Sequence, residues 1–213
     1  MKILIITASA NVAGLTAACG EAARQGIVDG HSPARVLNLD ELEIARCAVC
    51  GDGWGTCRSE HRCQIDDEFQ ALHESIKQAE GYVVVTPVYF GEPSEVVKAT
   101  FDRLRRCEAT KDESAGESSA LSGKPAILIA AAGGSGHGAV HCLAEMERVF
   151  AALRADVFDT IPVTKRTRGY QLETIHDALA AMVNAPRTAA TPAPSLPARD
   201  ERRHRPMRGR RRH

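Results

Sequence analysis

The chain has 213 residues, of which 44% are hydrophobic, 25% are charged and only 4% are aromatic, and its formal net charge is zero. This length and composition are typical of a globular protein with one sizeable core. No apolar run approaches the roughly 20 residues of a membrane-spanning helix, and the odd number of cysteines, seven, argues against a secreted disulfide scaffold. We therefore expect a cytoplasmic protein that does not enter a membrane.

Charge is unevenly distributed along the chain. Residues 186–213 contain nine arginines against Asp200 and Glu201, together with five prolines and almost no large apolar side chains. Because such a composition cannot build a core, we predict a folded domain at residues 1–184 and a disordered, Pro/Arg-rich basic tail at residues 185–213. A basic tail can contact nucleic acid or an anionic membrane, but a solvated tail is the simpler interpretation, and we expect no nucleic-acid partner.

The apolar pattern predicts five strands that alternate with five helices. Strands are expected at residues 2–7, 34–39, 82–85, 125–132 and 157–163. Helices are expected up to residue 29, from residue 66, from residue 95, and at residues 139–154 and 170–182. Continuous apolar strands are typical of a parallel sheet that is buried on both faces. The predicted fold is therefore α/β, a three-layer sandwich with a five-stranded parallel sheet in the order 2-1-3-4-5 and helices on both faces.

The loop after the first strand is rich in small and hydroxyl residues. Ser9, Asn11 and Thr16 lie in it, just before a helix. Free backbone N–H groups at a helix N-terminus, supported by the helix dipole and by such side chains, commonly bind phosphate. The loop has neither a Gly-x-Gly-x-x-Gly pattern nor a Walker lysine, and a plain strand-to-helix turn explains it about as well.

Two aromatic residues follow the third strand. Pro87 cannot donate to a sheet ladder and is expected to end that strand, so that Tyr89 and Phe90 lie in a loop closed by Gly91. Ser94 is expected to cap the next helix. A planar ring could lie against this loop, although the two aromatic side chains could equally pack the loop onto the sheet.

A glycine-rich loop follows the fourth strand. Gly133, Gly134 and Gly136 carry no Cβ, so the backbone can approach a ligand closely, and His137 stands among them. In a sheet ordered 2-1-3-4-5, the loops after strands one, three and four meet at one edge. Together they predict one pocket, with a phosphate at the first loop and a ring between the second and third loops.

A set of short motifs runs through residues 1–183. They are residues 2–9, 14–16 and 37–40, the cysteines before residues 65–67, Thr86-Pro87-Val88-Tyr89-Phe90-Gly91, Lys98, Asp102-Arg103, and residues 123–125 and 133–134. With these motifs the chain resembles the flavodoxin-like NAD(P)H-dependent FMN reductases, especially their branch related to iron–sulfur flavoproteins. The resemblance implies the flavodoxin-like fold, bound FMN, NAD(P)H as co-substrate, and assembly as a homodimer or homotetramer.

The resemblance also implies the residues around the flavin. The FMN phosphate would be held by Ser9, Asn11, Gly14, Leu15 and Thr16. The isoalloxazine ring would be bordered by Pro87, Val88, Tyr89, Phe90 and Gly91, and on its other side by Ala132, Gly133, Gly134 and Gly136. The family often has an arginine or lysine just after the first serine, where this chain has Ala10. The phosphate would therefore depend on backbone N–H groups, the helix dipole and hydroxyl groups.

Four cysteines lie between the second strand and the next helix, with the spacing Cys47-x2-Cys50-x6-Cys57-x5-Cys63. Thiolates this close in sequence could ligate an iron–sulfur cluster such as [4Fe-4S], or zinc. The middle gap is wider than the compact run of iron–sulfur flavoproteins. A redox-active thiol pair is a further alternative, and the interpretation that we favour is a structural loop without metal. The remaining cysteines fall in helix patterns and are expected in the core: Cys19, Cys107 and Cys142.

The resemblance implies an oxidoreductase that passes electrons from a nicotinamide through FMN to a quinone, a flavin or a similar small acceptor. Tyr89 and His137 are candidates to donate a hydrogen bond near the ring, although an exposed, idle His137 is the simpler interpretation. The pair Asp66-Asp67 is explained by a helix N-terminus, and Asp102-Arg103 by a structural ion pair. The alternatives are a flavodoxin-type electron carrier without nicotinamide turnover, with or without an iron–sulfur cluster, and a non-catalytic regulatory module that acts through its tail.

Overall fold

The structure is a computed structural model that describes residues 1–186. The basic tail predicted at residues 185–213 lies outside the described residues except for its first two, so its interpretation stays a prediction. Within residues 1–186, no helix combines the length and the apolar character that crossing a membrane requires.

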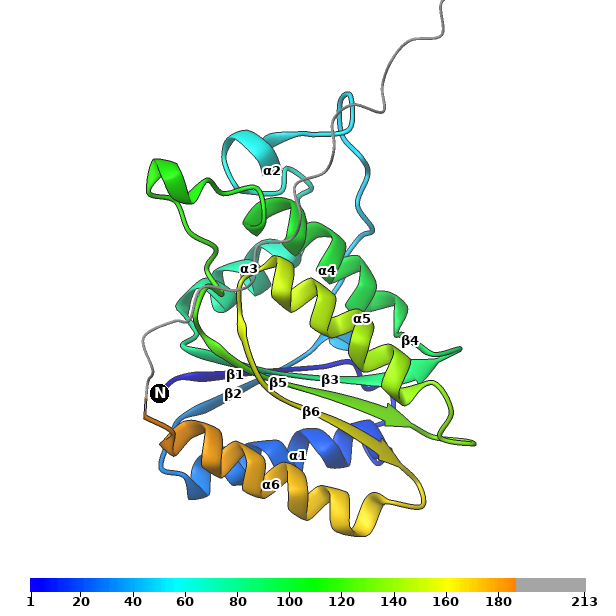
Figure 1. The fold of residues 1–213 in the computed structure, drawn as a ribbon. Coiled ribbons are helices and arrows are strands. Elements are labelled where there is room, and N and C mark those ends of the chain that lie inside the picture. Colours follow the sequence, from blue (N-terminus) through cyan, green and yellow to red (C-terminus); the bar gives the residue numbers. More distant parts are fainter. Residues whose placement is uncertain (187–213) are drawn as a thin grey trace, which may run out of the picture.

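One sheet forms the middle layer of the molecule (Figure 1). Its five parallel strands lie in the order β2 (Ala34–Asn38), β1 (Ile3–Thr7), β3 (Gly81–Tyr89), β5 (Pro125–Ala132) and β6 (Asp156–Thr164). This order confirms the 2-1-3-4-5 arrangement predicted for the parallel strands. A sixth strand was not predicted: the short β4 (Glu92–Pro93) pairs antiparallel with the end of β3.

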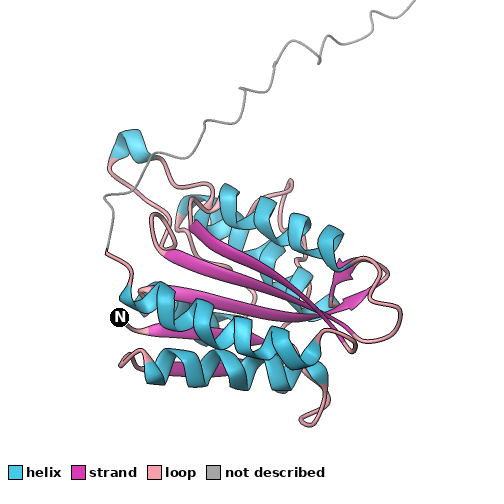
Figure 2. Ribbon diagram, turned by 60° about the horizontal axis from the view of Figure 1, so that its bottom comes forward, coloured by secondary structure: helices cyan, strands magenta, loops and turns pink. Residues whose placement is uncertain are grey.

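Helices cover both faces of the sheet (Figures 1 and 2). On one face lie α1 (Leu15–Asp29) and α6 (Arg168–Asn184), and on the other lie α3 (Phe69–Gln78), α4 (Glu95–Glu108) and α5 (Ala139–Ala152). The shorter elements are the 3-10 turns η1 (Leu39–Glu41) and η2 (Glu113–Ala115) and the one-turn helix α2 (Thr56–Ser59). The predicted three-layer sandwich is confirmed, although α3 begins three residues later than expected.

The central strands are apolar on both faces because helices cover both. In β1, Ile3 and Ile5 pack in the core beneath α1 and α6, whereas Leu4 and Ile6 pack in the core beneath the other three helices. Each buried side chain of this size contributes about 1.5–3 kcal/mol to folding. Two separate cores, one on each face, therefore fix the sheet and hold the loops at its carboxyl edge.

Pro87 does not end β3, contrary to our prediction. The strand continues to Tyr89, and Pro87 itself pairs with Ala131 of β5. On its other side, β1 ends at Thr7, opposite Val85 of β3. Because β3 has no β1 neighbour beyond that point, the missing N–H of the proline costs no ladder hydrogen bond there. The longer strand carries the aromatic loop further out than the sequence indicated.

Ser94 occupies the N-cap position of α4 but does not cap the helix with its side chain. Its backbone N–H donates to Thr86 Oγ1 at 3.0 Å, and its Oγ is buried without a hydrogen-bond partner among the described residues. The predicted side-chain cap is therefore wrong. The cause is β4, which folds back on β3 and so brings the Ser94 backbone against Thr86.

Candidate functional site

The loops after β1, β3 and β5 gather at one edge of the sheet. β1 and β3 run side by side up to the pair Thr7 and Val85, and the next residue, Ala8, donates its N–H to Val85 O at 3.1 Å. β5 pairs with the other side of β3. The predicted convergence of the three loops at the carboxyl edge is therefore found.

A pocket of about 540 Å³ lies between the loop after β3 and the loop after β5. Its lining includes these residues predicted around a ring: Val88, Phe90, Gly91, Ala132, Gly133, Gly134, Gly136 and His137. The other lining residues are Ser135, Gly138 and His141. This volume is within the usual range for a small-molecule or cofactor site. Pro87 and Tyr89 do not line the pocket, and the Tyr89 side chain is exposed.

Two glycines set the width of this pocket by bringing its two loops into direct contact. A Cβ placed on Gly138 would lie 2.6 Å from Gly91 Cα, which is too close for any real side chain. Both glycines have positive φ, +86° at Gly91 and +84° at Gly138. Only glycine combines this backbone conformation with such a close approach at little cost.

Phe90 stands at the mouth of the pocket in an unusual state. Its φ is +53°, in the left-handed region that aromatic residues rarely adopt, and its side chain is fully exposed. Strain of this kind concentrates at ligand-binding sites. Because this aromatic ring is exposed, packing against the protein does not offset the backbone strain. The ring is therefore available to cover a ligand or to contact another subunit.

The first loop is ordered by hydrogen bonds to β2. The side chain of Asn38, at the end of β2, accepts from Ser9 N–H at 3.0 Å and donates to Ser9 O at 3.1 Å. Ser9 Oγ donates to Asn11 O, and Asn11 Oδ1 accepts from Ala13 N–H. Sequence reasoning missed Asn38. The available signal was a polar residue at the end of the strand expected beside the first.

α1 begins at Leu15, directly behind this loop. Its N-cap residue, Gly14, has no side chain to satisfy the N–H groups of the first turn. Those groups, together with the helix dipole, suit an anion. Thr16, in the same turn, is buried. None of the residues from Ser9 to Thr16 lines the 540 Å³ pocket, so the two parts of the predicted site lie next to each other rather than in one cavity.

The two predicted hydrogen-bond donors occupy different positions. His137 is exposed and lines the pocket, and its backbone N–H donates to Ser135 Oγ at 3.3 Å, whereas Tyr89 lies outside the pocket lining. Sequence reasoning missed a second histidine, His141 of α5, which also lines the pocket. Its Nε2 lies 3.7 Å from Glu92 Oε1 and 3.6 Å from Glu145 Oε1.

A second site is formed by four cysteines in the segment between η1 and α3, which we call the cysteine segment. Cys47, Cys50, Cys57 and Cys63 all line one small cavity of about 20 Å³. Zn–S bonds of about 2.3 Å place the sulfurs of a zinc site within about 4 Å of one another. In the described part of the chain, no three of these sulfurs lie mutually within 4.8 Å. The thiols are therefore gathered around one cavity, but more widely than a single zinc ion requires.

The other three cysteines are buried in the core, as predicted, and take no part in this cavity. Burial raises the pKa of each of these thiols to about 12: Cys19, Cys107 and Cys142. A thiol with so high a pKa remains protonated at neutral pH and is a poor metal ligand or nucleophile. The four cysteines of the cavity are thus separated from the rest by their surroundings.

Arg103 of α4 ties together the two ends of the cysteine segment. Its Nη1 donates to Ala45 O at 3.0 Å and its Nη2 to Ile65 O at 3.3 Å, and both nitrogens bind the Asp67 carboxylate. The predicted ion pair with Asp102 is wrong: Asp102 is exposed, and Arg103 turns inward to Asp67. Neighbours in sequence on a helix point in different directions, so they seldom pair.

Arg106 of α4 and Thr110, which follows the end of this helix, contact the middle of the segment. Arg106 Nη1 donates to Gly53 O at 2.6 Å, and its guanidinium lies 4.7 Å from the centre of the Trp54 ring. Thr110 Oγ1 is 3.5 Å from Cys57 O. Arg103 and Arg106 are three residues apart and so share one face of α4. Sequence reasoning missed this face, and the available signal was Arg103, a charged residue at a buried position of α4.

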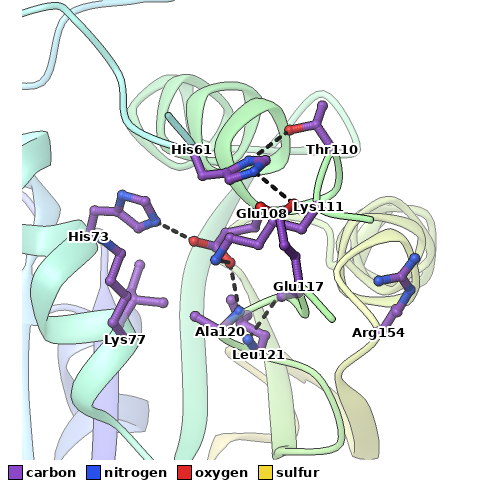
Figure 3. Close-up of polar contacts among 12 residues, drawn as sticks. His61, His73, Lys77, Glu108, Thr110, Lys111, Glu117, Ala120, Leu121 and Arg154 are labelled. Carbon is purple, nitrogen blue, oxygen red and sulfur yellow. Dashed lines mark hydrogen bonds and ion pairs between the residues drawn. The ribbon is translucent and has the colours of Figure 1, made fainter. Parts of the chain in front are cut away.

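Just beyond this face, α4 ends in a buried polar cluster around Glu108 (Figure 3). His73 Nε2 lies 2.6 Å from Glu108 Oε1, and Lys111 Nζ and Ala120 N–H donate to Oε2 at 2.8 and 2.6 Å. Burial alone would raise the pKa of Glu108, but the hydrogen bonds from these partners lower it to about 2. His61, drawn in the same view, contacts Thr110 and Glu117. The loop after α4 is therefore held by hydrogen bonds at Glu117 and at Ala120.

A parallel sheet ordered β2-β1-β3-β5-β6, with its loops around a pocket at the carboxyl edge, defines a flavodoxin-like α/β protein. Residues 1–165 match the family described as NADPH-dependent FMN reductase. Because the match covers well over half of the chain, the protein belongs to that family. The description of the family names FMN and NADPH.

Curated relatives include an iron-sulfur flavoprotein of Methanosarcina thermophila, 38% identical over 71 residues, which are 32% of this chain and 35% of that protein. An iron-sulfur flavoprotein of Methanocaldococcus jannaschii is 29% identical over 105 residues, 49% of this chain and 52% of that protein. The matched regions thus span only about a third to a half of the length of these relatives.

Solved structures show the same fold at low sequence identity. An NAD(P)H:quinone oxidoreductase from Methanothermobacter marburgensis superposes with a TM-score of 0.67 at 15% identity, covering 89% of this chain and 99% of that one. An FMN-dependent NADH-azoreductase from Bacillus anthracis, in complex with FMN, gives a TM-score of 0.63 at 13% identity, covering 86% and 100%. At this level of identity, the likeness concerns the fold.

Proposed function

We propose that the protein is an FMN-dependent oxidoreductase that takes electrons from NAD(P)H and passes them to a small acceptor such as a quinone or a flavin. The observation that carries the proposal is the open pocket between the loops after β3 and β5, at the same edge as the uncapped start of α1. A bound flavin would supply the redox chemistry that links the nicotinamide to the acceptor.

The residues of this edge fit FMN. A Cβ built on Gly133 or Gly134 meets no atom within 4 Å, so the backbone at both positions faces open space that a planar ring can approach. Val88 and Gly91 line the opposite loop. The phosphate would be held by the free N–H groups of the first turn of α1 and by the loop from Ser9, which Asn38 orders. No basic side chain is required for this arrangement.

Side chains at the rim would orient the reactants and restrict the entry of water. His137 and His141 line the pocket and could each donate a hydrogen bond to a polar atom bound there. The exposed ring of Phe90 stands at the mouth. We propose that Phe90 packs either on a bound ring or on a second copy of the chain, which is consistent with a homodimer or homotetramer.

The test is anaerobic reduction of the purified, FMN-loaded protein. NADH or NADPH should bleach the flavin absorbance within seconds, and addition of a quinone or of free flavin should restore it. Gly134→Val should prevent FMN binding, because the side chain would fill the space offered to the ring. Gly169→Val, at an exposed position of α6 with no atom near its built Cβ, is the matched control and should bind FMN normally. Bound flavin that neither nicotinamide bleaches would refute turnover and favour the electron-carrier alternative.

A second, additional function is suggested by the cysteine cavity. We propose that Cys47, Cys50, Cys57 and Cys63 ligate an iron–sulfur cluster that exchanges electrons with the flavin. Support comes from the gathering of all four thiols around one cavity. Ligands of a cluster bind different iron atoms and so stand farther apart than ligands of one ion. The names of the curated relatives point the same way.

Metal analysis tests this second proposal directly. Protein prepared without oxygen should contain about four iron and four sulfide per chain, the content of a [4Fe-4S] cluster with four cysteine ligands. Cys57→Ser should lower both, whereas Cys142→Ser, in the core of α5, should leave both unchanged. Zinc in place of iron, or no metal in protein that retains FMN, would exclude the cluster and leave the flavin proposal intact.

A further inference from the structure

We propose that Arg103 and Arg106 form a positively charged wall of the cysteine cavity that raises the reduction potential of its occupant. Arg103 acts as a positioning residue by donating its Nε–H to a cysteine sulfur, and Arg106 acts through its charge. The inference rests on the proposed cluster site and adds to it which residues of this chain set the energy of the transferred electron.

The first observation is an unused donor. The Arg103 side chain is fully buried, and its two terminal nitrogens are satisfied by Ala45 O, Ile65 O and the Asp67 carboxylate. Its third nitrogen, Nε, is buried without any hydrogen-bond partner among the described residues. Since a buried N–H is normally paired, the lone Nε of a residue that lines the cavity indicates an acceptor that belongs there.

Four cysteine sulfurs share the cavity with Arg103 and are the acceptors that a bound metal would fix in place. Cys63 is buried and lines the same cavity. A metal bound in the cavity would bring one of these sulfurs to where it can accept the Arg103 Nε–H. A thiolate that is bound to iron accepts such a hydrogen bond.

The second observation is an excess of positive charge. The charge of Arg103 is balanced by Asp67. Arg106, which lines the cavity beside it, makes no ion pair within residues 1–186; its partners are the Gly53 carbonyl and the Trp54 ring. A cavity with four thiols and an unbalanced guanidinium fits an anionic occupant better than an empty or neutral one.

The Arg103 hydrogen bond and the Arg106 charge stabilise the reduced cluster more than the oxidised cluster. Reduction of a cluster held by four thiolates adds one electron and no proton, so its negative charge increases by one. Hydrogen bonds to the sulfurs and nearby positive charge stabilise the added electron and raise the reduction potential. The effect is strong where water is excluded. Arg103 and Arg106 thus favour electron transfer from a reduced flavin to this site.

The test is a dye-mediated redox titration of the whole protein, with the reduced cluster followed by electron paramagnetic resonance. Arg106→Gln should make reduction at least tenfold less favourable, a negative shift of about 59 mV for a one-electron couple. Arg106→Lys, which keeps the charge, should shift it much less. Arg105→Gln, at the neighbouring exposed position of α4, is the matched control and should leave the potential unchanged.

Arg103→Lys separates the hydrogen bond from the charge. It should also lower the potential, because lysine keeps the charge but has no Nε–H in that position. Circular dichroism and the fluorescence of Trp54, the one tryptophan of the chain, report whether the cysteine segment stays folded. If Arg106→Gln does not retain a cluster, the cluster content of Arg106→Lys decides. A cluster retained by Arg106→Lys would support the role of the positive charge, and loss of the cluster in both variants would refute that role.

A cluster that is present in Arg106→Gln and Arg103→Lys, with unchanged potential in both, would overturn the inference while leaving the cluster proposal standing. Wild-type protein without iron would overturn both proposals, and the metal analysis identifies that case before any titration begins.

Discussion

Glu108 offers the sharpest test of how this structure is stabilised. Its side chain is fully buried and is held by His73, Lys111 and the Ala120 N–H, which lower its pKa from 4.5 to about 2. Each pH unit of difference in pKa between the folded and unfolded states corresponds to about 1.4 kcal/mol. The ionised carboxylate therefore contributes about 3 kcal/mol to the free energy of unfolding.

The sign of the pH dependence follows from the lowered pKa. The contribution is fully present above about pH 5, where Glu108 is ionised in the folded and the unfolded chain, and it is lost as the pH falls from 4.5 toward 2. Glu108→Gln keeps the shape of the side chain and removes the charge. It should lower the free energy of unfolding by about 2–4 kcal/mol at pH 7, because His73 and Lys111 then face a neutral amide.

Urea unfolding of both proteins, followed by far-ultraviolet circular dichroism at pH 7, 5, 4 and 3, measures this effect. The difference between wild type and Glu108→Gln should shrink by about 2 kcal/mol between pH 7 and pH 3. Glu74→Gln removes a carboxylate from an exposed pair with Lys77 and is the matched control, with an expected change of at most about 1 kcal/mol. A wild-type-to-Glu108→Gln difference that is the same at pH 3 as at pH 7 would refute the reasoning.

Two further substitutions test the pocket and the cysteine segment. Gly138→Ala places a Cβ against the backbone of the neighbouring loop, at a residue with positive φ. This substitution should weaken FMN binding at least tenfold in a fluorescence titration, whereas Gly169→Ala should leave it unchanged. Equal affinities of the two variants would show that the contact between the loops does not shape the site. Asp67→Asn leaves the buried Arg103 without its counter-charge and should lower the free energy of unfolding in urea by about 3–5 kcal/mol. Asp66→Asn, at an exposed position, should lower it by about 0.5 kcal/mol or less. Similar losses in the two variants would contradict the ion pair as the cause.

The architecture was predictable because the signals for it are local. A buried parallel strand must be apolar on both faces, and residues 125–132 show this so clearly that the predicted and observed bounds of β5 coincide. Strand order and the gathering of three loops at one edge then follow from the general connection rules of parallel sheets. Glycines at the pocket were predictable for the same reason, since they mark places where the backbone must come close to something.

The errors fall where distant segments meet. Pro87 was expected to end β3, but the length of β1, a different strand, decides whether the missing N–H matters. Arg103 was paired with its sequence neighbour, although its partner, Asp67, arrives from the far end of the cysteine segment. A side chain pairs with whatever the fold places beside it, and no local pattern contains that information.

The layers, the strand order and the edge where the three loops gather could all be predicted from the sequence, because hydrophobic periodicity and loop composition are properties of short segments. That four cysteines spread along the segment line one cavity, together with Arg103 and Arg106, became visible only in the folded chain. Hydrogen bonds and charges act over a few ångströms in space, so the environment of a thiol depends on packing between elements rather than on its spacing along the chain.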